Sequence, residues 1–422
     1  MIAIDFGTTN SSVVVWSEGD TEPRVRPLEY GDSESYEANV LPSVVCECLT
    51  HSCLKDRYGH EALRHGFEQQ HDSKLLQEMK LYFDRSTIDR PTLIETRIIT
   101  ALREEGGILN PVTKIQRFAC YRGDVPLKPS DFVPGTAKLF REIIRRSDAR
   151  PNDKRELVIG FPASFHAKGV RHLREAAKLG AFGENAGYEK VFMYLEPVAA
   201  ARAYMKIAEG NILVLDYGGG TLDISVLKIN DPEKFAKNSI HINGFPEAGA
   251  SMDEAIVDYC RSKDPKIETW FNAQPLKVQL RFKRSIEKAK VKLSTEQDST
   301  VDLSDSGLDP FQLTILDISY ALQPIMTRMV SKVMQTIIET LGSIDKVDFV
   351  VMSGGACLSK VVQTSVLAMF KHLPPDKFVV PDARDPQKVH TALCAVAKGL
   401  ALLRMDGHES VNIGSLEEIV RR

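Results

Sequence analysis

The sequence lacks the features that mark membrane, secreted and nucleic-acid-binding proteins. No hydrophobic run reaches the roughly 18 residues that a membrane helix needs, and the first residues enter an expected strand without a targeting segment. Lysine and arginine number 54 against 57 acidic residues, and the formal net charge of −3 is too weak to attract nucleic acid or anionic lipid by itself. We therefore expect a soluble, cytoplasmic protein without nucleic-acid or membrane partners.

Cysteine is also sparse: only seven of the 422 residues are cysteine, and they are scattered along the chain. An odd, scattered set does not make a disulfide framework in a protein of this length. Cys46, Cys48, His51 and Cys53 lie close together, but their spacing lacks the second ligand pair of a typical zinc site. We expect free thiols in a reducing compartment.

Two short segments of the chain look like copies of one device. They are Asp5-Phe6-Gly7-Thr8-Thr9 and Asp216-Tyr217-Gly218-Gly219-Gly220-Thr221, and their leading aspartates lie 216 − 5 = 211 positions apart. Each segment lies between two aliphatic or β-branched runs, which predicts a strand, a tight turn and a second strand. Backbone N–H groups of such a turn can surround an anion. Two facing hairpins would therefore hold one polyphosphate from both sides.

The two leading aspartates imply a divalent cation. Asp5 and Asp216 would repel a polyphosphate unless a cation lay between them, and Mg²⁺ that keeps most of its waters suits this position. A turn aspartate often bonds only its own backbone, but the matched pair favours the metal. The polar side chains of the turns, which can donate hydrogen bonds to phosphate oxygens, are those of Thr8, Thr9, Asn10 and Thr221.

Glu196 and Lys80 are candidates for the chemical step. Glu196 ends an expected buried strand just before Pro197, and Lys80 lies outside the apolar stripe of a helix expected over 73–83. Glu196 could orient an attacking water, and Lys80 could neutralise charge on a transferred phosphoryl group. Taken alone, either one is more readily explained as an ordinary surface residue.

The order of the remaining elements indicates two α/β lobes with mixed central sheets. We expect lobe I over 1–209, lobe II over 210–405 and a short C-terminal tail over 406–422. The stretch from 84 to 130, with its paired glycines and two prolines, predicts weak helix mixed with loop. Other strands are expected at 40–45, 157–163, 211–215, 225–229 and 347–352, and helices at 135–146, 167–180, 198–205, 276–294, 319–341 and 388–403.

Five motifs together resemble the nucleotide-binding domain of the seventy-kilodalton heat-shock chaperones, in the actin, sugar-kinase and heat-shock ATPase superfamily. The motifs are D-F-G-T-T-N, F-P-A-S-F followed by L-E-P-V-A-A-A, L-D-Y-G-G-G-T-L-D-I-S, I-E-K-A-K-V-K-L-S and V-V-M-S-G-G-A-C-L-S-K. They occur in the family's order across nearly the whole chain. The resemblance implies a duplicated actin-like fold, in which ribonuclease H-like lobes with mixed five-stranded sheets and flanking helices enclose a nucleotide cleft.

The resemblance also implies ATP or ADP with Mg²⁺ as cofactors, and roles for particular residues. Asp5 and Asp216 match the magnesium-organising carboxylates, Glu196 the water-orienting glutamate and Lys80 the catalytic lysine, while Asp216 and Thr221 also count among the catalytic residues. The matches to phosphate-side contacts are Gly7, Thr8, Thr9, Asn10, Gly218, Gly219, Gly220, Thr221 and Asp223. The matches on the nucleoside side are Glu287, Lys290 and Ser294, whose spacing gives one helix face, and the turn at Gly354 and Gly355.

The chain departs from the family pattern at three places. Val291 and Leu358 stand where the chaperones sandwich adenine between two arginines. How tightly this chain binds the base, and which base it binds, are therefore open. The segment 248–256 resembles the bacterial actin homologue MreB as much as the chaperones. Only 19 residues follow Leu403, too few for a peptide-binding domain, so we expect a stand-alone switch or a regulatory relative.

The leading hypothesis is an ATP-binding and ATP-hydrolysing switch, related to the chaperones, whose lobe closure is sensed by an unidentified protein partner. One alternative is a nucleotide-dependent filament protein like actin or MreB. A second is a small-molecule kinase of the same superfamily, although Glu196 before Pro197 suits water better than a sugar hydroxyl. A nucleotide binder without turnover is also open.

Overall fold

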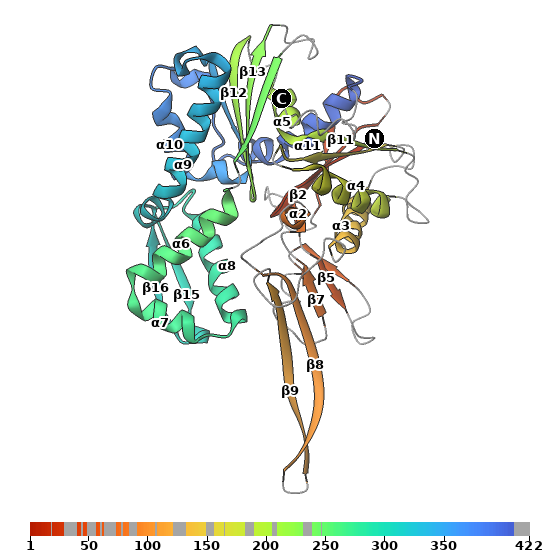
Figure 1. Cartoon of the computed structure of the whole chain (residues 1–422), viewed down its shortest axis with the longest axis vertical. Coiled ribbons are helices and arrows are strands. Elements are labelled where there is room, and N and C mark those ends of the chain that lie inside the picture. The colour runs from red at the N-terminus through yellow and green to blue at the C-terminus, as the bar shows by residue number, and fades with distance from the viewer. Residues whose placement is uncertain are drawn as a thin grey trace.

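The computed structural model describes most of the chain at the level of individual elements. Two central sheets dominate it, one in each half of the chain (Figure 1). The described residues are 1–17, 19–28, 40–43, 45–48, 56–59, 61–62, 73–76, 79–83, 91–105, 108–120, 132–148, 156–163, 165–181, 190–204, 209–230, 239–245 and 247–408.

The first sheet has the order β11-β10-β1-β2-β3, and β4 also pairs with β2. β1 runs antiparallel to β2 and parallel to β10, which runs parallel to β11. The sheet thus has six described strands instead of the five expected, because β3 and β4 pair with different parts of the same β2 edge. The strands are β1 (Ile2–Phe6), β2 (Asn10–Val15), β3 (Arg24–Val25), β4 (Val40–Pro42), β10 (Glu156–Phe161) and β11 (Lys190–Leu195).

The second sheet repeats the first, with the order β14-β13-β12-β17-β18. β12 runs antiparallel to β13 and parallel to β17, as β1 does with β2 and β10. Asp5 near the end of β1 and Asp216 near the end of β12 therefore hold equivalent places. The duplication seen in the turns extends to the whole sheet. Its strands are β12 (Gly210–Tyr217), β13 (Leu222–Ile229), β14 (Ser239–Phe245), β17 (Phe349–Ser353) and β18 (Phe378–Val379).

Helices flank both sheets and join the two halves. α5 and α11 pack closely, because Gly399 has no side chain and a Cβ there would lie 1.8 Å from the Ala199 carbonyl oxygen. α11 also packs on β1, β2, β10 and β17, and a hydrophobic cluster with members such as Val14, Val214 and Leu400 draws on both sheets. The helices are α3 (Val133–Arg146), α4 (Ala167–Ala181), α5 (Glu196–Tyr204), α9 (Ile315–Leu341), α10 (Lys360–Met369) and α11 (Pro386–Met405).

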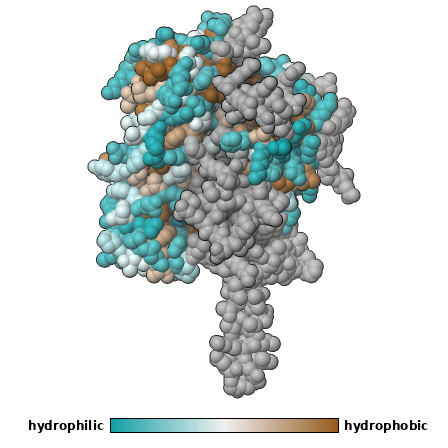
Figure 2. All heavy atoms as spheres, viewed as in Figure 1, coloured by the Kyte–Doolittle hydropathy of each residue, from teal (hydrophilic) through white to brown (hydrophobic). Residues whose placement is uncertain are grey.

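A smaller group of elements lies beside the second sheet (Figure 1). Its buried side chains continue the hydrophobic core of the second sheet, and Phe271 and Phe282 stack edge to face there with ring centroids 5.6 Å apart. The surface in Figure 2 is largely hydrophilic where the residues are described, with scattered hydrophobic patches. The elements of this group are α6 (Gly249–Lys263), α7 (Pro265–Ala273), α8 (Leu276–Lys292), β15 (Asp298–Leu303) and β16 (Leu308–Thr314).

Two predictions for the region between the first sheet's strands are wrong. The helix expected over 73–83 is a strand, β7 (Ser73–Leu76), followed by a single helical turn, α2 (Met79–Tyr82). The stretch from 84 to 130, expected to be weak helix and loop, contains β8 (Pro91–Glu105) and β9 (Ile108–Cys120), which project as a long antiparallel pair (Figure 1). The run expected over 40–45 divides into β4 and β5 (Val45–Cys48). One further sheet, in the order β6-β5-β7-β8-β9, is made of β5, β7, β8, β9 and β6 (Arg57–Tyr58), whereas β4 belongs to the first sheet.

The other expected elements are present with shifted ends. Among the described residues, no helix has the length and apolar character to cross a membrane. Cys260, Cys357 and Cys394 are buried free thiols, as expected, whereas His51 and Cys53 lie outside the described residues. The tail over 409–422 also lies outside them.

Candidate functional site

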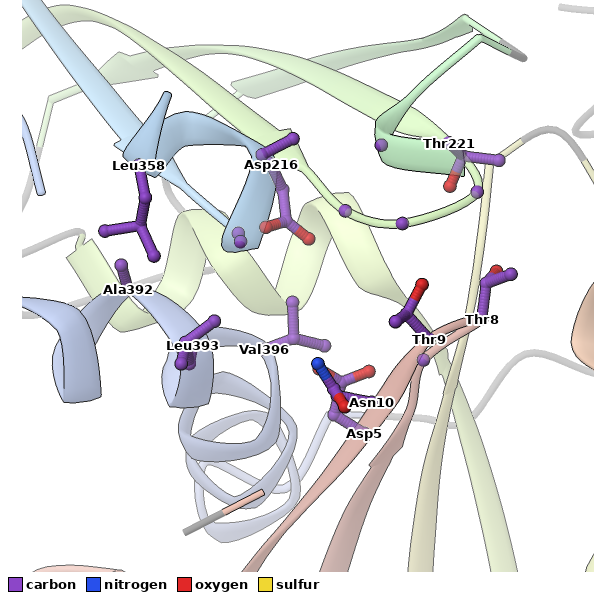
Figure 3. Close-up of a pocket in the computed structure, with 18 of the residues that line it drawn as sticks. Asp5, Thr8, Thr9, Asn10, Asp216, Thr221, Leu358, Ala392, Leu393 and Val396 are labelled. Carbon is purple, nitrogen blue, oxygen red and sulfur yellow. The ribbon is translucent and has the colours of Figure 1, made fainter. Parts of the chain in front are cut away.

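One pocket contains all of the predicted site residues (Figure 3). The turns that end β1 and β12 form one side of it, while α8, the 3-10 turn Gly355–Leu358 and α11 form the other. Asp5 and Asp216 lie on opposite walls with their carboxylates toward the space between them. The predicted residues that line the pocket are Asp5, Gly7, Thr8, Thr9, Asn10, Lys80, Glu196, Asp216, Gly218, Gly219, Gly220, Thr221, Asp223, Glu287, Lys290, Ser294, Gly354 and Gly355.

The two glycine turns touch each other. A Cβ on Gly219 would lie 2.1 Å from Thr9 Oγ1 and 2.9 Å from Thr9 Cβ, so only glycine allows this approach. The second turn is held in place because Gly218 N–H donates to Thr221 O, and the first turn of α6 donates from Gly249 and Ala250 to the Gly218 and Gly219 carbonyls. The two glycine turns therefore line one common pocket.

Lys80 and Glu196 form a buried ion pair in this space. Lys80 Nζ donates to Glu196 Oε1 at 2.5 Å, and each residue is only 4% exposed. Glu196 is the first residue of α5, and Gly160 makes room for it, since a Cβ there would lie 2.8 Å from Glu196 Cγ. Burial by itself would lower the pKa of Lys80, but Glu196 and Asp5 hold it above its usual value. The lysine is therefore charged at neutral pH.

Three aspartates, Asp5, Asp216 and Asp223, lie in the same pocket as this ion pair. Burial, followed by the nearby Glu196 carboxylate, raises the pKa of Asp5 and Asp223 well above the usual range and that of Asp216 to about 6. The Ala163 N–H donates to Asp223 at 3.2 Å and partly offsets this shift. Four carboxylates, of which those of Glu196 and Asp223 are buried, line the pocket with one lysine near them, so the site favours added positive charge.

The oxygen donors fit Mg²⁺ held through water. Carboxylates are the hard ligands that Mg²⁺ prefers, and this ion usually keeps several waters in place of a complete protein cage. Within the described part of the chain, no three His, Cys, Asp or Glu side chains come close enough to enclose a metal directly. The residues present therefore suit a hydrated ion between Asp5 and Asp216.

The raised pKa of Asp216 predicts a pH-dependent stability. Because the pKa is about 6 in the folded chain and near 3.8 in the unfolded one, the folded chain binds the extra proton between these values. This carboxyl therefore lowers stability as pH rises from 4 to 6, and the loss persists above pH 6. Without metal, Asp216→Asn is expected to raise the free energy of unfolding at pH 7 by up to about 3 kcal/mol and by much less at pH 4. Equal effects in urea titrations at both pH values would contradict the shift.

The far end of the pocket is built on α8. Glu287, Lys290 and Ser294 line this end of the pocket. Lys290 Nζ pairs with Asp253 at 2.6 Å and donates to the Gly249 carbonyl at 3.3 Å, which fixes its head group between α6 and α8. Gly354 has φ +84°, and a Cβ there would lie 2.5 Å from the Tyr217 carbonyl oxygen, so glycine is required where the turn crosses β12.

Two functional candidates were missed by sequence reasoning. Asp253 lines the pocket as the partner of Lys290, and its only signal was a carboxylate in the segment already noted for its likeness to MreB. Ser353 lies opposite Asp216 across β12 and β17, and its hydroxyl lowers the pKa of Asp216 against the effect of burial. Ser353 Oγ also lies 3.0 Å from the Ala392 carbonyl oxygen, which competes for the hydrogen of the same hydroxyl. Both depend on contacts between residues distant in sequence.

Comparison with known families agrees with this geometry. A family model described as "Hsp70 protein" matches residues 139–395, more than half of the chain. The chain belongs to the Hsp70 family. Proteins named chaperone protein DnaK from two strains of Thermus thermophilus are each 29% identical over 265 residues, which cover 58% of this chain and 41% of the relative.

The Hsp70 family model begins at residue 139, so the site residues before that position are supported by the geometry of the pocket alone. Asp5, the first glycine turn and Lys80 precede the matched range, but they line the same pocket as Glu196 and Asp216, which lie inside it. The duplicated sheets and helices agree with the two-lobed actin-like fold of Hsp70 proteins. The chain spans less than half the length of the DnaK relatives it matches, so it corresponds to part of such a protein.

Proposed function

We propose that this pocket binds ATP and ADP with Mg²⁺ and hydrolyses ATP. The observation that carries the proposal is the contact of the two glycine turns, Thr9 against Gly219, directly beside the buried Lys80–Glu196 pair. Backbone N–H groups of both turns would bind the phosphates from two sides, and the hydroxyls of Thr8, Thr9 and Thr221 would add donors. The bound Mg²⁺ would supply positive charge that neutralises the phosphates.

The chain's own residues divide the remaining tasks. Lys80 uses one of its three donors on Glu196, which leaves two for oxygens of the transferred phosphoryl group. Glu196 would orient the attacking water, because its carboxylate is bonded to Lys80 and its side chain fits against Gly160, which has no Cβ. On the nucleoside side, Glu287 and Lys290 present polar atoms to ribose hydroxyls, with Lys290 positioned by Asp253.

We further propose that the nucleotide sets the angle between lobe I (1–209) and lobe II (210–405), and that a protein partner senses this angle. The site draws residues from both parts, so binding and hydrolysis would change the contacts that hold them together. The names of the DnaK relatives support a chaperone-related role. Glu196, which precedes Pro197 at the start of α5, suits an attacking water better than the hydroxyl of a small-molecule acceptor.

Thermal unfolding with and without Mg·ATP tests the proposal. Ligand at a hundred times its dissociation constant should add about 2.7 kcal/mol to the free energy of unfolding. Asp216→Asn is expected to lose most of the magnesium-dependent part of this gain, because it removes a carboxylate that holds the hydrated ion. Asp258→Asn, at an exposed aspartate of α6 outside the pocket, should keep the full gain. A wild-type chain that gains no stability from Mg·ATP would exclude the proposal.

A further inference from the structure

The end of the pocket away from the glycine turns is aliphatic. Leu358, Ala392 and Leu393 lie on that side in Figure 3, while Thr8, Thr9 and Thr221 lie on the other. Val291, which is 49% exposed, and Ala356 also line the pocket. None of these five side chains carries a polar atom. A nucleotide whose phosphates lie at the turns places its base against this aliphatic surface.

The backbone at this end is already hydrogen-bonded within the protein. Gly354 N–H donates to the Ala392 carbonyl, and the Gly354 carbonyl accepts from Cys357 N–H. The Ala356 carbonyl accepts from Ser359 N–H, and the Val291 carbonyl accepts from Ser294 N–H. These groups are therefore engaged before a base arrives, which reduces their use in reading the edge of a base.

The polar side chains near this end do not distinguish one purine from another. Ser294 and Ser359 line the pocket, and a hydroxyl can either donate or accept, so it can bond the 6-amino group of adenine or the 6-oxo group of guanine. A site rejects an analogue strongly only when it holds buried groups that the analogue leaves unpaired. An aliphatic surface with two adaptable hydroxyls provides no such group.

Charge does not supply discrimination either. No arginine is among the described residues that line the pocket. Both lysines that line it are paired, Lys80 with Glu196 at 2.5 Å and Lys290 with Asp253 at 2.6 Å. Among the described residues that line the pocket, no cation is therefore left to stack on the face of a base.

We propose that this site binds purine ribonucleoside triphosphates with little preference between adenine and guanine. Phosphate and ribose contacts provide the affinity, and Val291, Leu358 and Leu393 hold the base by apolar contact alone. This inference rests on the proposed function of the pocket. It identifies Val291 and Leu358 as residues that contact the base without selecting it.

Calorimetric titration of the full chain with Mg·ATP and with Mg·GTP tests the inference. We expect dissociation constants within about threefold of each other, since no hydrogen-bonding group is dedicated to either base. A difference of tenfold or more would overturn the inference and leave the proposed function intact if Mg·ATP binds. Failure of both triphosphates to bind would instead overturn the proposed function and the inference together.

Arginine substitutions provide a second measurement. Leu358→Arg or Val291→Arg should place a guanidinium against the base and tighten both Mg·ATP and Mg·GTP by about two- to fivefold, because a cation–π contact acts on the face of either base. Leu367→Arg adds the same charge on α10, 37% exposed and outside the pocket, and should change neither affinity. If Leu358→Arg and Val291→Arg both leave the two affinities unchanged, the base does not lie at this surface and the inference is wrong.

Discussion

Replacing Glu196 by glutamine is expected to lower ATP turnover by about a hundred- to a thousandfold, the usual contribution of a positioned acid or base. Its carboxylate is held beside Lys80 at the start of α5, where it can accept a hydrogen bond from an attacking water. Glutamine keeps the shape but loses the charge. Single-turnover release of inorganic phosphate from preformed enzyme and Mg·ATP measures the chemical step directly.

The affinity for Mg·ATP separates loss of chemistry from loss of fold. It should stay within a few-fold of wild type in Glu196→Gln, since the glycine turns are unchanged. Glu156→Gln is the matched control, because Glu156 is half-buried and pairs with Arg404 at 2.6 Å outside the pocket. Its turnover should equal that of wild type. Equal turnover in Glu196→Gln would remove Glu196 from the mechanism and favour a site that only binds nucleotide.

The glycine turns and the elements around them could be predicted because their signals are local. At Asp5 and at Asp216, neighbouring residues carry the whole signal. An aspartate follows a β-branched or aliphatic run, and glycines that allow a tight turn come directly after it. Long amphipathic helices such as α3 and α11 are local in the same sense. Family resemblance then added residues on and next to α8 and the turn at Gly354 and Gly355, which no spacing rule would have linked to the glycine turns.

The errors lie where pairing with distant strands decides the structure. Leu75 and Leu76 fit a helical stripe, but the segment Ser73–Leu76 pairs with β5 on one side and β8 on the other. In the β8 and β9 pair, the alternation of Thr92, Ile94 and Thr96 favours a strand, and Gly106-Gly107 is typical of a two-residue hairpin. The prediction of weak helix and loop rested on these glycines and on the prolines, but Pro111 occupies a strand with a described partner on only one side, where a proline is tolerated.

Alanine at Gly219 is expected to weaken Mg·ATP binding by about a hundredfold, since a displacement of about 1 Å at a binding site can have an effect of this size. The added Cβ would lie 2.1 Å from Thr9 Oγ1 and 2.9 Å from Thr9 Cβ, so rotation of the threonine relieves only the first contact. The two turns must therefore separate, and one polyphosphate can no longer reach the N–H groups of both. Calorimetric titration of the purified variant measures the loss.

The neighbouring glycine gives the closest comparison. A Cβ on Gly218 would meet nothing nearer than the Thr221 carbonyl oxygen at 3.5 Å, an ordinary contact, so Gly218→Ala should weaken binding much less than Gly219→Ala does. Both variants make the same chemical change in the same turn, and only one separates the two halves of the pocket. If the two lose affinity equally, alanine acts on the turn itself. The contact between the copies would then contribute nothing to nucleotide binding, and each turn would have to act alone.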